Sequence, residues 1–386
     1  MLIKSLKLIN LLSFGSNSDV TELKPLNVII GPNGSGKSNF LEAIGLLKNL
    51  PGQLQKTFHE TGGVDDWLWR GANETPIVGV DAVIDYPDSP NMDLRYFLCF
   101  AIRNHRFFMV DESIEDAKPQ MDCETPKWYY QFNEREPRAK SKDTIRTLTS
   151  VDPERSILAQ LRDPDMYPEI THLGDTLNHI KLYDKWGIGQ NCLPRHPQKA
   201  DLPNDFLDED CSNLGLVLNR LRQIPPVKQR ILSALQELFD GIDDYDVQVI
   251  AGYVQVVMQE HGFTIPATRL SDGTLRYLCL LAILCHPTPP PLICIEEPEL
   301  GLHPDILPTL AELLKEASTR CQLIVTTHSD ILVDAMTDQP ESVLICEKGE
   351  SGTELSRLSA EELKPWLEKY RLGELWISGE LGGKRW

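Results

Sequence analysis

The segment from Gly31 to Ser38, which reads GPNGSGKS, has the residue types and the spacing of a loop that binds nucleotide phosphates. It follows a β-branched run, Leu26 to Ile30, and precedes a helical pattern, which is the strand–loop–helix context that such a loop requires. Glycines let the chain turn so tightly that main-chain N–H groups surround phosphate oxygens, and the helix directs its positive end at the same anion. Lys37 would place its charge on the β- and γ-phosphates as a catalytic group, and the Ser38 hydroxyl would bind Mg²⁺. The residues expected to bind the nucleotide are Gly31, Pro32, Asn33, Gly34, Ser35, Gly36, Lys37, Ser38 and Asn39.

Two adjacent acids end a second buried run nearer the C-terminus. The apolar residues Leu292 to Ile295 predict a strand that delivers Glu296 and Glu297 to its end. Two carboxylates at the end of a buried strand are costly unless a cation or water accompanies them. In a phosphate-loop enzyme Glu296 would hold Mg²⁺, and Glu297 would orient or deprotonate the attacking water. The alternative is a solvated loop, because Glu-Glu pairs are common in loops.

Two weaker signals lie on either side of this acidic strand. Leu270 to Thr274 reads LSDGT, a polar turn before an apolar helix, in which Ser271 could cap the helix and Gly273 leaves main-chain N–H groups free. His328 follows the apolar run Leu323 to Val325 and could donate a hydrogen bond to a γ-phosphate. Taken alone, the first signal is a plain helix cap and the second a surface histidine.

The composition argues against several classes of protein. The 386 residues include 57 acidic and 38 basic side chains, and the net charge of −19 disfavours a surface coated in positive charge for non-specific nucleic-acid binding. One local basic groove stays compatible with this balance. No apolar stretch approaches the roughly 20 residues of a membrane helix, so no membrane contact is expected. The nine cysteines are scattered without a CxxC pair, which predicts reduced thiols and a cytoplasmic location.

The order of these motifs resembles that of the ABC-type ATPase family. The phosphate loop comes first, Ser271 stands 26 residues before Glu297, and His328 stands 31 residues after it. The resemblance implies an α/β fold, a P-loop NTPase with an ABC-type ATPase head, an antiparallel β-lobe and a compact, mainly helical insertion. It also implies ATP with Mg²⁺, and a homodimer that encloses ATP. In that dimer the phosphate loop, Glu297 and His328 of one subunit would face Ser271 and Gly273 of the other.

Three segments narrow the resemblance to one branch. IEEPELGLHP, TTHS and the opening IKSLKLINLLSFGS look like the soluble ABC-type group, which contains RecF, the SMC proteins and stand-alone AAA ATPases found beside nucleases in bacterial DNA maintenance and anti-phage defence. The closing LGELWISGELGGKRW is similar to the tail of a group of predicted ATPases of that kind. The chain departs from the family pattern at Asp272 and Thr274 in the signature, at His303 where transporters carry Asp, and at Glu296 where Asp is more usual.

A long middle region, 232 residues from Asn39 to Leu270, separates the two halves of the predicted head. Its patterns predict, in order, β-lobe strands at 76–114 and 128–132, a mainly helical stretch at 157–239 and a hairpin at 247–265. Heptads are absent, which excludes a long coiled coil. We therefore expect an N-terminal lobe of the head at 1–150, a helical insertion at 151–240 and a C-terminal lobe at 241–386.

Three places in the middle region carry weaker hypotheses. The family has a glutamine-bearing loop that senses the γ-phosphate, and Gln160 is the candidate for that glutamine; the alternative is a solvated side chain. Arg70 could touch DNA or phosphate, or its stem could pack on Trp67 or Trp69. A basic stretch could meet nucleic acid, although a solvated loop is the simpler interpretation; it comprises Arg135, Arg138, Lys140 and Lys142.

The leading hypothesis is an ATPase whose dimer opens and closes with ATP and gates a partner, a nuclease or other effector or DNA, in DNA repair or anti-phage defence. The alternative is a scaffold or sensor that uses ATP as a clamp with negligible turnover. The large insertion and the EEPELGLHP segment disfavour an ABC transporter subunit. A nuclease in its own right is disfavoured because no separate acidic metal cluster is evident, and the C-terminal stretch is expected to be too short for a nuclease domain.

Overall fold

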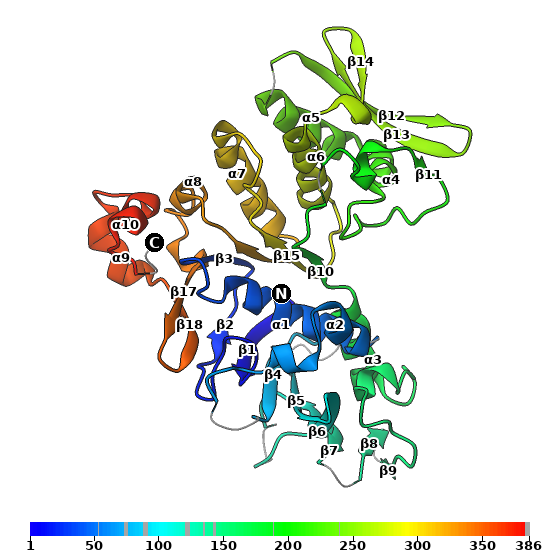
Figure 1. Ribbon diagram of the computed structural model, residues 1–386, viewed down its shortest axis with the longest axis vertical. Coiled ribbons are helices and arrows are strands. Elements are labelled where there is room, and N and C mark those ends of the chain that lie inside the picture. The colour runs from blue at the N-terminus through cyan, green and yellow to red at the C-terminus, as the bar shows by residue number, and fades with distance from the viewer. Residues whose placement is uncertain are drawn as a thin grey trace.

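The computed structural model of the chain describes residues 1–52, 54–72, 76–87, 92–119, 124–133, 136–141, 144–187, 189–238 and 240–382 (Figure 1). A six-stranded sheet lies at its centre, in the order β10 (Lys181–Tyr183), β15 (Leu292–Glu296), β16 (Gln322–Thr326), β3 (Leu26–Ile30), β17 (Val343–Gly349) and β18 (Gly352–Arg357). The first five strands are parallel, whereas β18 pairs antiparallel with β17. Because the carboxyl ends of parallel strands meet at one edge, the segments that follow β3, β15 and β16 converge there.

An eight-stranded antiparallel sheet forms a β-lobe on one side of the centre, as expected. Its order is β2 (Thr21–Glu22), β1 (Ile3–Ile9), β4 (Val78–Ile84), β5 (Leu94–Arg103), β6 (Arg106–Asp116), β7 (Trp128–Phe132), β8 (Arg138–Ser141) and β9 (Thr144–Thr147). Helix α1 (Lys37–Asn49) shares one hydrophobic core with this sheet and with the adjoining face of the central sheet. The apolar positions of α1 predicted from its periodicity are buried there: Phe40, Leu41, Ile44, Leu47 and, just after the helix, Leu50.

A second lobe covers the opposite face of the central sheet (Figure 1). It contains α4 (Leu214–Leu221), α5 (Pro225–Leu238), α6 (Asp272–Leu284) and a small sheet of β11 (Gln198–Lys199), β12 (Ile242–Ile250), β13 (Tyr253–Glu260) and β14 (Phe263–Pro266). These elements share their core with α7 (Leu307–Ser318), which packs against β16 and β3. We call this group of elements the helical lobe.

The segment 151–240, which the sequence suggested as one helical insertion, is instead divided among three parts of the fold. The short 3₁₀ helix η2 (Ile157–Ala159) packs against α3 (Pro168–Asn178), which in turn packs against α1 and against β7 of the β-lobe. β10 joins the central sheet next to β15. α4 and α5 belong to the helical lobe, and the hairpin predicted at 247–265 forms a sheet within that lobe rather than returning to the centre.

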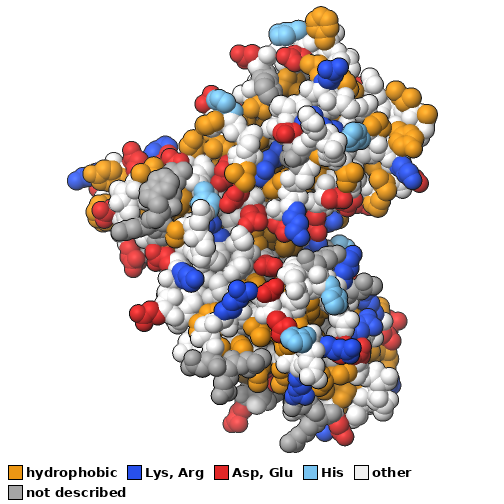
Figure 2. All heavy atoms as spheres, viewed as in Figure 1, with side chains coloured by type: hydrophobic (Ala, Val, Ile, Leu, Met, Phe, Trp, Pro, Cys, Tyr) orange, Lys and Arg blue, Asp and Glu red, His pale blue; other side chains and the backbone are white. Residues whose placement is uncertain are grey.

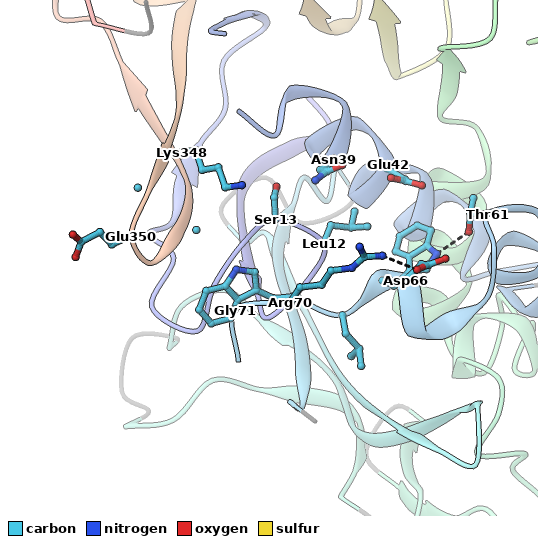
Figure 3. A pocket seen from close by; sticks show the side chains of 15 residues that line it. Leu12, Ser13, Asn39, Glu42, Thr61, Asp66, Arg70, Gly71, Lys348 and Glu350 are labelled. Atoms are coloured by element: carbon cyan, nitrogen blue, oxygen red, sulfur yellow. Dashed lines mark hydrogen bonds and ion pairs between the residues drawn. The ribbon is translucent and has the colours of Figure 1, made fainter. Parts of the chain in front are cut away.

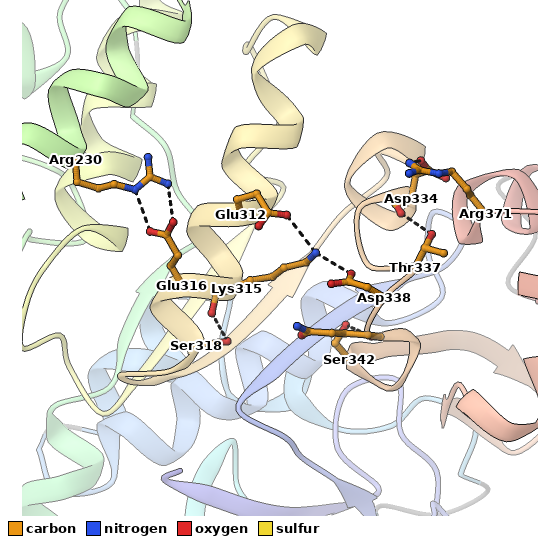
Figure 4. A network of polar contacts seen from close by, with 11 residues as sticks. Arg230, Glu312, Lys315, Glu316, Ser318, Asp334, Thr337, Asp338, Ser342 and Arg371 are labelled. Atoms are coloured by element: carbon orange, nitrogen blue, oxygen red, sulfur yellow. Dashed lines mark hydrogen bonds and ion pairs between the residues drawn. The ribbon is translucent and has the colours of Figure 1, made fainter. Parts of the chain in front are cut away.

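Ion pairs connect the outer helices of the C-terminal half (Figure 4). Arg230 of α5 contacts Glu316 of α7 through two hydrogen bonds of 3.0 and 2.9 Å. Lys315 of the same helix reaches Asp338, at 2.8 Å. Arg371 joins α10 (Leu372–Ser378) to α8 (Asp330–Asp334) through Asp334, at 2.7 Å. Helices α2 (Leu54–Glu60) and α9 (Ala360–Leu367) complete the α-helices of the described chain.

A buried glutamate ties the β-lobe to the segment that leaves it. Glu112 on β6 is 1% exposed, and it accepts hydrogen bonds from the Tyr96 hydroxyl at 2.7 Å and the Ser156 hydroxyl at 2.5 Å. The Ile157 N–H donates to its second oxygen at 3.0 Å. Burial outweighs these donors and raises the pKa of Glu112 to about 7, from an ordinary value of 4.5.

Glu112→Gln is expected to become progressively more stable than the parent as the pH rises from 5 to 8. Because the folded-state pKa lies above the unfolded one, the carboxyl contributes stability that is fully present below about pH 4.5 and lost as the pH rises through about 7. The shift corresponds to roughly 3 kcal/mol. Thermal unfolding of both proteins across this range measures the effect. A difference in Tm that does not change with pH would contradict it.

Candidate functional site

The phosphate loop leaves β3 and is pressed against the β17–β18 hairpin. Gly31 and Gly36 have φ values of +153° and +115°, in the region that disfavours residues with a Cβ. A Cβ at Gly36 would collide with the hydroxyls of Thr353 and Ser13, and one at Gly31 with the Cys346 carbonyl. Thr353 also donates to the Ser35 carbonyl at 2.7 Å. These contacts fix the shape of the loop.

The Lys37 side chain folds back over this loop. Its Nζ donates to the carbonyls of Gly31 at 2.8 Å and Pro32 at 3.0 Å, so the ammonium is held against the loop. Burial lowers the pKa of Lys37, and the nearby acids Glu297 and Glu296 oppose that shift. An anion bound by the loop would therefore meet a cation that is already in place.

Ser38 and Glu296 come together in the structure. Ser38 lies in the first turn of α1 and donates a hydrogen bond to the Glu296 carboxylate at the end of β15. Burial raises the pKa of Glu296, so its negative charge is held at a cost that a cation would offset. A hydroxyl and a carboxylate oxygen are the kind of ligand that Mg²⁺ prefers. The two residues therefore fit a magnesium ion shared with nucleotide phosphates.

Glu297 and His328 also meet, although 31 residues separate them in the sequence. The Glu297 N–H donates to the Thr326 carbonyl at 3.0 Å, which places the acid against the end of β16. Its Oε1 lies 3.4 Å from His328 Nε2. The Glu297 backbone has φ +44°, a left-handed conformation that is unusual for a residue with a side chain.

Glu299 is a member of this group that the sequence did not single out. It accepts hydrogen bonds of 2.7 Å from both the Thr327 hydroxyl and the His328 N–H. Burial raises the pKa of Glu299. Glu299 therefore fixes the chain at the point where His328 leaves β16. The sequence signal that could have identified Glu299 is its position two residues after the acidic pair, next to Pro298.

The signature residues line a cavity separate from the phosphate loop. Ser271 accepts a hydrogen bond from the Thr274 N–H at 3.0 Å and caps α6, and Gly273 lies so close to Gly301 that a Cβ would come within 2.5 Å of its carbonyl oxygen. Ser271, Gly273, Gly301 and His303 line one open cavity. Among the described residues, neither Ser271 nor Gly273 contacts the phosphate loop of its own chain.

Asp272, which departs from the family signature, has a specific partner. Its carboxylate pairs with Arg195, a buried side chain of the segment that leads into the helical lobe. Arg195 also donates to the Leu270 carbonyl at 2.5 Å. Asp272, the acid in the signature, is therefore paired with the Arg195 cation, and this pair fixes the start of α6.

Gln160 does not lie at this site, contrary to the expectation. Its amide nitrogen donates to the carbonyls of Asp152 and Arg155 at 3.1 and 2.8 Å, and its oxygen accepts from the Asp152 N–H. The Gln160 amide uses its hydrogen bonds to close this turn beside the β-lobe. The segment after β10, which contains Gln190, emerges at the edge of the sheet next to Glu296, because Tyr183 pairs with Ile295.

Two cavities flank the phosphate loop. One, of about 620 Å³, is lined by Asn39, Trp69, Arg70 and Lys348 among others, and in it Arg70 reaches Asp66 at 2.9 Å (Figure 3). The second lies at the narrow waist between the two lobes, where Figure 2 shows side chains of both charges. In the basic stretch, Arg138 and Lys140 lie on β8, whereas Arg135 and Lys142 fall outside the described residues.

Solved structures of SMC head domains have the same fold. The SMC head bound to the C-winged helix domain of ScpA aligns with a TM-score of 0.59 and 16% identity, over 93% of this chain and 99% of that one. The SMC head with an extended coiled coil bound to the C-terminal domain of ScpA, from Pyrococcus furiosus, gives 0.61 and 14%, over 96% and 99%. The head with a coiled coil and joint from Pyrococcus yayanosii gives 0.54 and 12%, over 96% and 99%. At these identities the likeness concerns the fold alone.

The sequence matches one family model over more than half of its length, and that model covers the motifs of the site. The matched residues are 26–96 and 201–334, and the family is described as "AAA domain, putative AbiEii toxin, Type IV TA system". Among curated proteins, no relative matches the sequence. No helix in the described part of the chain is long and apolar enough to cross a membrane. The matched ranges contain the phosphate loop, the signature, the acidic strand and His328, and the chain therefore belongs to this AAA domain family, as an ABC-type ATPase domain with the fold of an SMC head.

Proposed function

We propose that this ATPase domain hydrolyses ATP and that ATP holds two copies of the chain together, so that cycles of binding and hydrolysis open and close the dimer. One observation carries the proposal. The phosphate loop, the Ser38–Glu296 contact and the Glu297–His328 pair converge at one edge of the central sheet, whereas Ser271 and Gly273 line a separate cavity of the same chain. A second copy would bring the missing signature to the first copy's nucleotide.

The residues at the sheet edge divide the chemical work. Main-chain N–H groups of the loop and the Lys37 ammonium bind the β- and γ-phosphates. Ser38 and Glu296 would hold Mg²⁺, and the ion would supply positive charge to neutralise the nucleotide phosphates. Glu297 accepts a proton from a water molecule as that water attacks the γ-phosphorus, and the bond to the β-phosphate oxygen breaks to release ADP. His328 donates a hydrogen bond to the γ-phosphate and keeps the Glu297 carboxylate oriented.

The partner is proposed to be a nuclease or another effector protein, or DNA, in DNA maintenance or anti-phage defence. SMC heads of the same fold are seen bound to domains of ScpA, which supports a protein partner for this chain. The net charge of −19 indicates that a DNA contact would be confined to a small patch or supplied by that partner.

The described cysteines are all free thiols, which supports a cytoplasmic location.

Ser271→Asp is expected to keep ATP binding by the single chain and to weaken ATP-dependent dimerisation at least about a hundredfold. Aspartate is as good a helix cap as serine, so α6 should begin where it does now. Its charge would face the γ-phosphate of the neighbouring copy, and like charges at an interface cost several kcal/mol. Molar mass by light scattering with ATP, together with nucleotide affinity, measures both effects.

Ser271→Thr is the matched control, because it keeps the hydroxyl cap without adding charge. It should dimerise like the parent. If the aspartate variant dimerises with ATP as readily as the parent, the signature does not face a neighbour's nucleotide, and the proposed dimer is wrong.

A further inference from the structure

Two side chains from outside β15 donate hydrogen bonds to the backbone carbonyls of Glu296 and Glu297. Trp186 Nε1 donates to the Glu296 carbonyl at 3.0 Å, and Arg276 Nη2 donates to the Glu297 carbonyl at 2.8 Å. The Arg276 guanidinium also lies over the Trp186 ring, 4.6 Å from its centre. Two consecutive peptide groups are thus held by one stacked pair.

The two side chains come from separate parts of the fold. Trp186 follows β10, at the edge of the central sheet next to β15. Arg276 lies on α6, five residues after the Ser271 cap, and is 8% exposed. Burial lowers the pKa of Arg276, and the nearby Glu299 is the strongest influence that opposes this shift. A buried guanidinium on a carbonyl is costly unless its partners are well placed.

The peptide groups on both sides of the Glu297 Cα are pinned. Its N–H is bound to the Thr326 carbonyl at 3.0 Å, and its carbonyl is bound to Arg276. Together these bonds hold the φ of +44°, which a residue with a Cβ does not adopt readily. Because the direction of the Cβ follows from φ and ψ, the same bonds aim the Glu297 side chain at His328. Loss of the Arg276 bond would free the second peptide group.

Two polar atoms near this hydrogen-bond network are left without partners in the described part of the chain. Among the described residues, Arg276 Nε and Glu299 Oε2 are buried without a hydrogen-bond partner. A buried donor and a buried acceptor of opposite charge, both unsatisfied, favour any small shift of α6 that lets them pair. Such a shift would move the guanidinium that holds the Glu297 carbonyl.

We propose that Arg276, stacked on Trp186, is a positioning residue that holds the Glu297 backbone and thereby orients the carboxylate that accepts the proton of the attacking water. The inference rests on the proposed role of Glu297 in hydrolysis. Since Ser271 caps the helix that carries Arg276, a contact that moves the start of α6 also alters the orientation of Glu297. Hydrolysis is then sensitive to the packing of the helical lobe against the acidic strand.

Arg276→Met is expected to lower kcat by about 100-fold, the loss associated with a displacement of roughly 1 Å at a reacting group. Methionine keeps the apolar stem but cannot donate to the Glu297 carbonyl. KM and ATP affinity should stay within about twofold, because the phosphate loop is not touched. Arg276→Lys retains a cationic donor and should recover part of the rate. Trp186→Phe keeps an aromatic ring under Arg276 and loses the indole N–H together with part of the ring area, so a smaller loss, about 10-fold, is expected.

Arg320→Met is the matched control. Arg320 donates to the carbonyls of Leu284 at 2.6 Å and His286 at 3.3 Å, at the opposite end of α6 from Ser271. Its loss should lower Tm while kcat stays at the parent value. A similar fall of kcat in this variant would show that general loosening of α6 accounts for the Arg276 effect, and would overturn the proposal.

A double variant separates this inference from the proposed function. If Arg276 acts through Glu297, Arg276→Met should cause no further loss in single-turnover hydrolysis when Glu297 is already glutamine. Additive losses would overturn the positioning role and leave the role of Glu297 intact. If Glu297→Gln alone hydrolyses ATP at the parent rate, it is the proposed role of Glu297, on which this inference rests, that fails.

Discussion

Replacing Glu297 with glutamine is expected to lower steady-state phosphate release from ATP by about a thousandfold while ATP binding persists. General-base catalysis by a positioned side chain contributes typically 10²- to 10⁴-fold, and glutamine has the size of glutamate without a basic oxygen. The phosphate loop is unaltered, because Lys37 is held by loop carbonyls rather than by Glu297. ATP would then stay bound, and a long-lived dimer should accumulate.

Phosphate release and molar mass in the presence of ATP and Mg²⁺ measure the two effects together. Glu341→Gln is the matched control, since Glu341 lies just before β17, at the sheet edge opposite the site, and pairs with Lys24. Parent-like turnover in Glu297→Gln would exclude Glu297 as the base. If the unaltered protein dimerises with ATP but releases no phosphate above background, the clamp of negligible turnover is the better account.

Lys37→Ala is expected to weaken ATP binding at least about a hundredfold, because removing one partner of a charged, hydrogen-bonded contact costs about 2–5 kcal/mol. The variant should nevertheless fold, since the Lys37 ammonium is buried at a cost and its loss removes no ion pair from the described structure. Ligand linkage makes the difference easy to see. ATP at a hundred times its Kd raises the stability of the parent by about 2.7 kcal/mol, and the variant should show no such rise.

Thermal unfolding with and without ATP and Mg²⁺ measures this prediction. Lys24→Ala removes a lysine at the opposite edge of the central sheet, where it pairs with Glu341, and should retain the full rise in Tm. An equal rise in Lys37→Ala would mean that the nucleotide binds elsewhere.

Features that depend on neighbours in the sequence were predictable. The loop from Gly31 to Ser38 can be recognised from the spacing of its own residues. The β-branched run before it correctly predicted the strand β3. The alternating segments at 76–114 became β4, β5 and β6, and the apolar face of α1 is buried as its periodicity indicated. Such patterns indicate which side chains are buried. The buried side chains of β3 and α1 hold the two elements between which the phosphate loop lies.

Features that depend on a short strand were not predictable. β10 has three residues, too few for a periodic signal, yet it places Trp186 beside Glu296. Without β10 in the central sheet, residues 151–240 looked like one insertion, and Gln160 looked like the link to the site. Arg276 followed the signature in an apolar helix and gave no sign that its partner is a main-chain carbonyl 21 residues away.

The position of β3 in the central sheet has a consequence for how the protein is made. β3 lies between β16 and β17, whose residues are synthesised about 300 positions later. At 5–20 residues per second, a ribosome needs roughly 15 to 60 seconds to cover that interval. During this time the phosphate loop has neither of its flanking strands, and Thr353 and Cys346, which press on its glycines, do not yet exist. A nascent chain therefore cannot bind ATP through a finished loop, and it gains that capacity only as its last strands emerge.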